Sequence, residues 1–111
     1  MTTEKSLLEF DVPIQLGELV LASAVFNTAA CDNKFQDEVQ SALYKHMHGD
    51  WGERNDTKNK IINDIGAKYG DTQIVSMYHT SYGELWVLTA ADRSKTTVSF
   101  PTRAAIPQMT A

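Results

Sequence analysis

The chain has 111 residues, of which 42% are hydrophobic and 22% are charged, so it suits one folded domain with one core. Its formal net charge of -4 argues against nonspecific binding to nucleic acid, which needs clustered Lys and Arg, and against an anionic membrane surface. The single cysteine, Cys31, excludes an internal disulfide and a thiolate zinc cluster, and we expect it to be small and partly buried.

The first segments of the chain predict a short strand followed by a short helix. Residues 1–6 are typical of an unstructured lead-in, and residues 7–13 of a short extended piece. Residues 1–8 contain charged residues and no long apolar run, so no signal peptide is predicted. Residues 17–22 are rich in aliphatic side chains and predict a strand. Ser23 is a candidate N-cap for a helix over residues 24–30.

The clearest pattern is an amphipathic helix after a second candidate cap, Asp32. Its apolar positions recur at helical spacing and define one face: Phe35, Val39, Ala42, Leu43, His46 and Met47. Gly49 is expected to end this helix because glycine readily takes positive φ. Residues 50–55 then form a polar connection in which Trp51 packs over the helix end, with a stacking or interface role as the alternative.

A third helix is predicted from a cap at Asp56 to Tyr69, with Gly70 as its stop. Its apolar stripe is expected to face the core, and it consists of Ile61, Ile62, Ile65 and Tyr69. Gly66 inside the helix costs about 1 kcal/mol relative to alanine, for which close packing is a reason.

The last third of the chain predicts a β-meander. Strands are expected over residues 73–80, 85–90 and 96–100, with a hairpin connection at 81–84 and a turn at 91–95. The middle strand is apolar at both parities, so we expect it to be covered on both faces, with Trp86 in the core. The predicted fold class is α+β: a strand, two to three helices, then a three-stranded antiparallel meander packed against the helices. Residues 1–101 form one domain in this prediction, and residues 102–111 a flexible tail.

Three acidic residues and two histidines near the end of the long helix are candidates for chemistry. His46, His48 and Asp50 have ligand types that suit zinc, but residues i and i+2 point about 200° apart on a helix, so no metal site is predicted. Asp50, Glu53 and Asp56 could serve acid–base catalysis or magnesium, although caps and turns also favour Asp.

The turn between the last two strands carries Asp92, Arg93, Ser94 and Lys95. Arg93 and Lys95 could contact a phosphate or a carboxylate, and Arg93 could pair with Asp50 or Asp56. Asp92 and Ser94 are equally typical of turn formation. No Gly-rich phosphate loop, Ser-His-Asp order or Cys-His pair stands out in the sequence.

Two motifs of this chain resemble those of a family of short proteins from plasmids and other mobile bacterial elements. Members of this family are often labelled plasmid-related, and some are labelled as a type I restriction subunit. The first motif, His-x-x-Gly-Asp-Trp-Gly, is matched by His46, Gly49, Asp50, Trp51 and Gly52. Asp56 and Asn59 then correspond loosely to a polar helix that contains Asp and Asn. The second motif, Trp-Ile-Ile-Thr-Glu-Ala-Asp-Arg-Ser-x-Thr-Thr with a following Pro, is matched by Trp86, Thr89, Ala91, Asp92, Arg93, Ser94, Thr96, Thr97 and Pro101.

The resemblance covers residues 16–101 and implies a plasmid or phage setting. Ala90 stands where the family pattern has Glu, and Thr102-Arg103-Ala104 replaces an acidic-aromatic ending, so roles that rest on those carboxylates do not carry over. Proteins of this size and setting often bind host defence machinery, which is an association and not a mechanism.

The leading hypothesis is a small noncatalytic accessory protein, cytoplasmic in its bacterial host, that binds a host protein such as a CRISPR or restriction component. The predicted binding surface consists of Asp50, Trp51, Glu53, Asp56 and Arg93. The alternative is a small enzyme or ligand-binding module, with or without a divalent ion, whose pocket consists of His46, Asp50, Asp56, Asp92 and Arg93.

Neither hypothesis calls for a cofactor, and nucleic acid ranks lowest as a partner. Lys58, Lys60 and Lys68 on the third helix would form a basic surface, but Asp56 and Asp64 dilute their field. Both leading hypotheses require that the connection after the long helix folds back onto the last β-hairpin, so that the regions of Trp51 and Trp86 form one neighbourhood.

Overall fold

The computed structural model describes residues 14–53, 57–70 and 72–101, and these form three helices and one sheet. The helices are α1 (Ser23–Cys31), α2 (Asn33–Met47) and α3 (Thr57–Tyr69). The strands are β1 (Glu18–Leu21), β2 (Ile74–Thr80), β3 (Gly83–Thr89) and β4 (Lys95–Ser99). The α+β class is therefore confirmed. The expected lead-in, the extended piece at 7–13, the cap at Asp56 and the tail at 102–111 lie outside the described residues.

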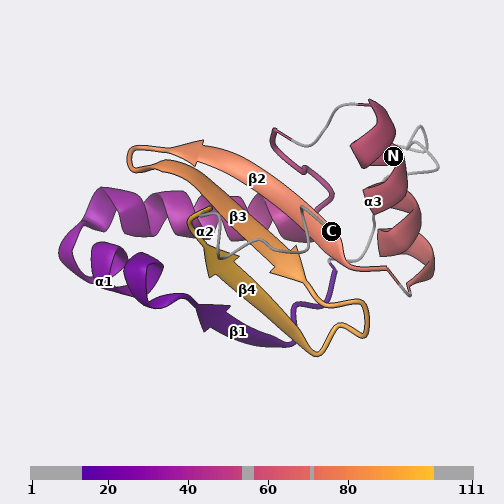
Figure 1. The fold of residues 1–111 in the computed structure, drawn as a ribbon, viewed down its shortest axis with the longest axis horizontal. Coiled ribbons are helices and arrows are strands. Elements are labelled where there is room, and N and C mark those ends of the chain that lie inside the picture. The colour runs from indigo at the N-terminus through magenta and orange to yellow at the C-terminus, as the bar shows by residue number, and fades with distance from the viewer. Residues whose placement is uncertain (1–13, 54–56, 71, 102–111) are drawn as a thin grey trace, which may run out of the picture.

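The sheet is mixed and has the order β1-β4-β3-β2 (Figure 1). The last three strands form the predicted antiparallel meander, and β1 joins it beside β4 in parallel orientation. Helix α2 lies across one face of the sheet, and α3 packs beside β2 (Figure 1). No helix within the described ranges has the length and apolarity to cross a membrane.

One face of the sheet is buried beneath the helices. Successive side chains of each strand point alternately to this face and to the opposite one. The side chains of the buried face come from every second position of β2, β3 and β4: Ile74, Ser76, Tyr78, Leu85, Val87, Thr89, Thr96 and Val98. The main apolar cluster joins this face to Val25 of α1 and to Phe35, Val39 and Ala42 of α2. The apolar face predicted for the long helix is therefore confirmed.

The ends of α2 follow the predicted local chemistry. The Asp32 side chain accepts hydrogen bonds from the backbone amides of Lys34 (2.9 Å) and Phe35 (3.2 Å), as an N-cap does. Gly49 takes a φ of 88° just after the helix. The expectation for Ser23 was wrong: it is the first residue of α1, and the capping position is Ala22, which has no side-chain hydrogen bond. Cys31, at the end of α1, is exposed and not partly buried.

The orientation predicted for α3 was also wrong. Its apolar stripe faces outward, with exposed fractions of 49% for Ile61, 46% for Ile62, 50% for Ile65 and 72% for Tyr69. The helix instead buries Asn63 (4%) and Asp64 (1%). The buried polar atoms have partners on other elements, which removes the usual cost of burying them. Gly66 does pack closely, because an added Cβ would lie 3.2 Å from Ile74 Cδ1.

Trp86 also differs from its prediction. It lies on β3 between the buried residues Leu85 and Val87, so it points to the opposite face of the sheet and is only partly buried. Leu88 shares that face. Strand β3 is interior to the sheet, as predicted, but among the described elements the helices cover only one of its faces.

Candidate functional site

The two sequence motifs meet at a buried polar network centred on His46. This side chain extends from α2 to the sheet and has no exposed surface. Its Nδ1 lies within hydrogen-bonding distance of Ser76 Oγ on β2, and its Nε2 lies 2.8 Å from Thr89 Oγ1 on β3. Thr89 Oγ1 lies 2.7 Å from Thr96 Oγ1 on β4, and Thr96 donates to the carbonyl of Leu16 at 2.8 Å.

The carbonyl at the end of this chain sets the direction of every proton in it. A carbonyl only accepts, so the Thr96 hydroxyl uses its one proton there and must accept from Thr89. The Thr89 hydroxyl then accepts from His46 Nε2–H. Nε2 therefore carries a proton, and in the neutral imidazole Nδ1 accepts from Ser76.

Burial keeps His46 in this neutral state. Desolvation, followed by the positive charge of Arg93, lowers the pKa of His46 from 6.5 to about 4. The Trp51 indole stands edge-on to the imidazole, with ring centroids 5.7 Å apart and an interplanar angle of 76°. Both ring nitrogens already have partners, so in this conformation His46 offers neither a free base nor a free metal ligand.

Trp51 is held inside the molecule by α3. Its exposed fraction is 0%, and its Nε1 donates to Asp64 Oδ1 at 2.9 Å. Lys60 binds the other oxygen of Asp64 at 3.0 Å. The preferred interpretation of Trp51, packing that closes the core, is confirmed, and its predicted place on a binding surface is wrong because no part of it reaches the surface.

The connection around Trp51 is fixed against the edge of β2. Met77 N donates to Trp51 O at 3.2 Å, and Glu53 N donates to Met77 O at 2.6 Å. Gly52 has a φ of 65°, and an added Cβ would lie 2.1 Å from Met77 O, so only glycine fits there. The connection therefore folds back onto β2, the first strand of the meander, and not onto the last β-hairpin as a whole.

The two indoles nevertheless lie on opposite faces of the sheet. Trp51 packs with Ile74 and contacts His46 on the helix-covered face. Trp86 pairs with Met77 in register on the other face. Alternation along β2 and β3 separates them, so the expected shared neighbourhood holds for the backbone segments and not for the two side chains.

Among the residues that the structure describes, the partners of Arg93 are backbone carbonyls and not carboxylates. Its guanidinium donates to Thr72 O and Gly66 O, both at 2.7 Å, and to Ala90 O and Ala91 O in its own turn. The residue has a φ of 63°, which is uncommon for a side chain with a Cβ. Arg93 thus holds the β3–β4 turn against the C-terminal part of α3, where a cation also suits the helix dipole.

The remaining candidate residues are turn formers or partly exposed. Asp50 accepts from Gly52 N at 3.0 Å, and its carbonyl accepts from the Tyr78 hydroxyl at 2.6 Å. Asp92 accepts from Ser94 N at 2.9 Å, and hydrogen bonding by the Ser94 side chain and amide lowers the pKa of Asp92. Glu53 lies 3.5 Å from His79 with about half of its side chain exposed. Asp56 lies outside the described residues.

The described part of the chain holds no group of three or more His, Cys, Asp or Glu side chains placed to bind a metal. His48 follows the end of α2, where its ring lies 4.3 Å from that of Tyr44, and it is exposed. His46 and His48 therefore point to different environments, as the helical spacing predicted.

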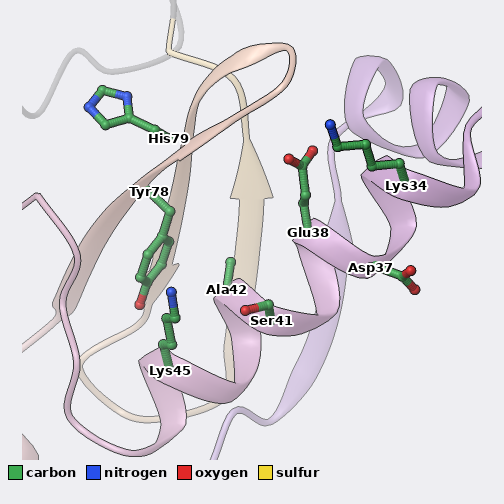
Figure 2. A pocket seen from close by; sticks show the side chains of 8 residues that line it. All are labelled: Lys34, Asp37, Glu38, Ser41, Ala42, Lys45, Tyr78 and His79. Atoms are coloured by element: carbon green, nitrogen blue, oxygen red, sulfur yellow. The ribbon is translucent and has the colours of Figure 1, made fainter.

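A cavity of about 320 Å³ lies elsewhere, between α2 and β2 (Figure 2). Charged side chains of both signs dominate its lining: Lys34, Asp37, Glu38, Ser41, Ala42, Lys45, Tyr78 and His79. Glu38 points from α2 toward the β2–β3 hairpin (Figure 2), where it accepts from the amide and hydroxyl of Ser81. None of the predicted site residues that the structure describes lines this cavity. The spacing of Lys34, Glu38, Ser41 and Lys45 along one face of the helix was the signal that could have indicated it.

Comparisons with known protein families, with curated proteins and with solved structures found no match to this chain.

Proposed function

We propose that this chain is a noncatalytic accessory protein of a plasmid or phage that binds a host protein through the outward face of α3. The observation that supports this proposal is the reversed orientation of that helix. Its large apolar side chains, Ile61, Ile62, Ile65 and Tyr69, are 46–72% exposed, while it buries Asn63 and Asp64. Contiguous exposed apolar side chains on a small protein are typical of an interaction surface.

The charges around this face indicate what kind of partner fits it. Lys58 and Lys68 are exposed on the same helix, and Lys60 is about half exposed. Asp64 points inward to Trp51, so the helix adds no carboxylate of its own to the outer surface. A fitting partner has an apolar groove that receives the isoleucines and carboxylates at its rim that face the lysines.

The setting of the proposal comes from the motif resemblance. His46, Trp51, Arg93 and Thr96 match the plasmid-related pattern, and in this structure they hold the fold together. The motif residues thus belong to the scaffold, and the outward face of α3 consists of other residues. We therefore propose a component of a CRISPR or restriction system, in the host cytoplasm, as the partner class.

The alternative, an enzyme or ligand-binding module, receives less support from the geometry. It needs His46 and Arg93 to face a substrate, whereas His46 is buried with both nitrogens engaged and Arg93 binds four carbonyls. Thermal shifts with magnesium, zinc and nucleotides test this alternative, because a ligand that prefers the folded state raises Tm.

The test of the binding proposal uses substitutions that leave the fold intact. Ile61→Lys and Ile65→Lys place charges on an exposed face, so each should change the free energy of unfolding by less than about 0.5 kcal/mol. Tagged full-length protein would be expressed with a CRISPR or restriction system, the recovered component purified, and its affinity measured by calorimetry. We expect each substitution to weaken binding at least tenfold, and Gln40→Lys, on the exposed side of α2, to leave it unchanged.

Two results would overturn the proposal. One is that no defence component binds the wild-type protein in a defined ratio. The other is that Ile61→Lys, Ile65→Lys and wild type bind with equal affinity. If the lysines of α3 retained nucleic acid, and 0.3 M salt released it, the partner would be a nucleic acid and not a protein.

A further inference from the structure

The two edge strands of the sheet, β2 and β1, differ in how many of their outward-facing backbone groups are hydrogen-bonded. At the β2 edge, Asn63 donates to Val75 O at 2.8 Å and accepts from Val75 N at 3.4 Å. The backbone amide and carbonyl of Met77 are hydrogen-bonded to the Trp51–Glu53 connection. The Glu38 carboxylate accepts from Ser81 N at 3.1 Å. Most of the outward-facing backbone groups of this edge are thus occupied, which is how proteins prevent strand addition.

No described residue protects the β1 edge in this way. Glu18 N donates to Ser94 O and Ala22 N to Val98 O, both at 2.9 Å, so alternate residues of β1 face β4. The amides and carbonyls of Leu19 and Leu21 therefore face away from the sheet. Within the described ranges no group pairs with them, and Figure 1 shows β1 along the open side of the sheet.

This edge is also held rigidly in place. Gly17, just before β1, has a φ of 64°, and an added Cβ would lie 2.4 Å from the backbone of Ser94. The backbone of residue 17 thus packs directly on the β3–β4 turn. A preformed edge loses little conformational entropy when a strand adds to it, which favours binding.

We propose that β1 pairs antiparallel with β1 of a second copy, so that the two sheets join across a twofold axis at Val20. In this register Leu19 lies opposite Leu21 of the partner subunit, and the two exchange backbone hydrogen bonds. Val20 lies opposite Val20 of the partner subunit, and Glu18 lies opposite Ala22 of the partner subunit. The register places no like charges opposite each other, and β1 contains no lysine or proline that would prevent pairing.

Exposed apolar side chains near this edge favour a protein occupant. Leu19 is 46% exposed, and Phe26, on the helix that follows β1, is 58% exposed. A strand of four residues buries less than the ~1,200 Å² of a standard interface, so the dimer is expected to be weak and concentration-dependent.

The first test measures the mass of the full-length protein by sedimentation over a range of concentrations. Wild type should rise from 12.4 kDa toward twice that mass. Leu19→Pro should remain a monomer, because it removes an outward N–H that β4 does not use, and proline is tolerated at such edge positions. Leu19→Val keeps the N–H and should still dimerise.

A second test examines the register between the two β1 strands, and it does not require Leu19→Pro to fold. In a Cys31→Ser background, Val20→Cys should form a disulfide-linked dimer under mild oxidation, and Leu21→Cys should not. The proposal is overturned if wild type stays monomeric up to millimolar concentration, or if folded Leu19→Pro dimerises as wild type does. Equal cross-linking by both cysteine variants would also overturn it.

Discussion

The Trp51 indole donates a 2.9 Å hydrogen bond to the Asp64 carboxylate, and both side chains are almost completely buried. This bond joins the connection after α2 to α3. Trp51→Phe keeps an aromatic ring but removes the donor, so it should lower the free energy of unfolding by about 1–3 kcal/mol. Urea denaturation followed by circular dichroism measures the loss.

A double-mutant cycle with Asp64→Ala, which removes the acceptor, separates this bond from the smaller volume of phenylalanine. The combined variant should lose less stability than the sum of the two single variants. Strictly additive losses would mean that the bond contributes nothing and that packing alone explains the effect.

His46 should make folding depend on pH. Its pKa is about 4 in the folded protein against 6.5 ordinarily, so between these values the unfolded chain binds a proton that the folded protein does not. Above pH 6.5 this group has no effect, and stability falls as the pH drops from 6.5 toward 4, by about 3 kcal/mol in total. Urea unfolding at several pH values between 7.5 and 4 measures the change.

The matched variant for this prediction is His46→Gln, which keeps an amide donor and an acceptor but does not titrate. Its absolute stability is expected to be lower, and its loss between pH 6.5 and 4 smaller than that of wild type. If both proteins lose stability in parallel, other groups cause the dependence.

Neighbouring threonines on β4 offer a controlled test of the buried network. Thr96→Val leaves the Thr89 hydroxyl and the Leu16 carbonyl without their partner, so it should cost about 1–3 kcal/mol. Thr97→Val makes the same chemical change on the partly exposed opposite face and should change stability by less than about 0.5 kcal/mol. Equal effects in thermal unfolding would show that the network does not stabilise the fold.

Local sequence signals predicted α2 well. Its apolar positions repeat at helical spacing, Asp32 caps its start, and Gly49 follows its end. All three signals act over a few residues, so they can be read without knowing the tertiary structure. The meander was predictable for the same reason, because alternation and turn residues are local.

The parts that were mispredicted depend on distant partners. The periodicity of α3 separates a polar from an apolar face but does not say which one packs inward. That choice is decided by Asn63 with Val75 and by Asp64 with Trp51, 12 and 13 residues away. The buried network was missed likewise, since His46 meets Ser76 and Thr89 across 30 and 43 residues.

Arg93 should be required for the last turn of α3 to remain folded. Its guanidinium donates to Gly66 O, the same carbonyl that accepts from Gly70 N at 2.7 Å. Arg93→Ala should therefore cost about 1.5–3 kcal/mol and speed amide hydrogen exchange of Gly70. Arg93→Gly loses the same guanidinium but suits the φ of 63°, so it should be about 1 kcal/mol more stable than Arg93→Ala. Unchanged exchange at Gly70 in both variants would show that the guanidinium does not hold α3.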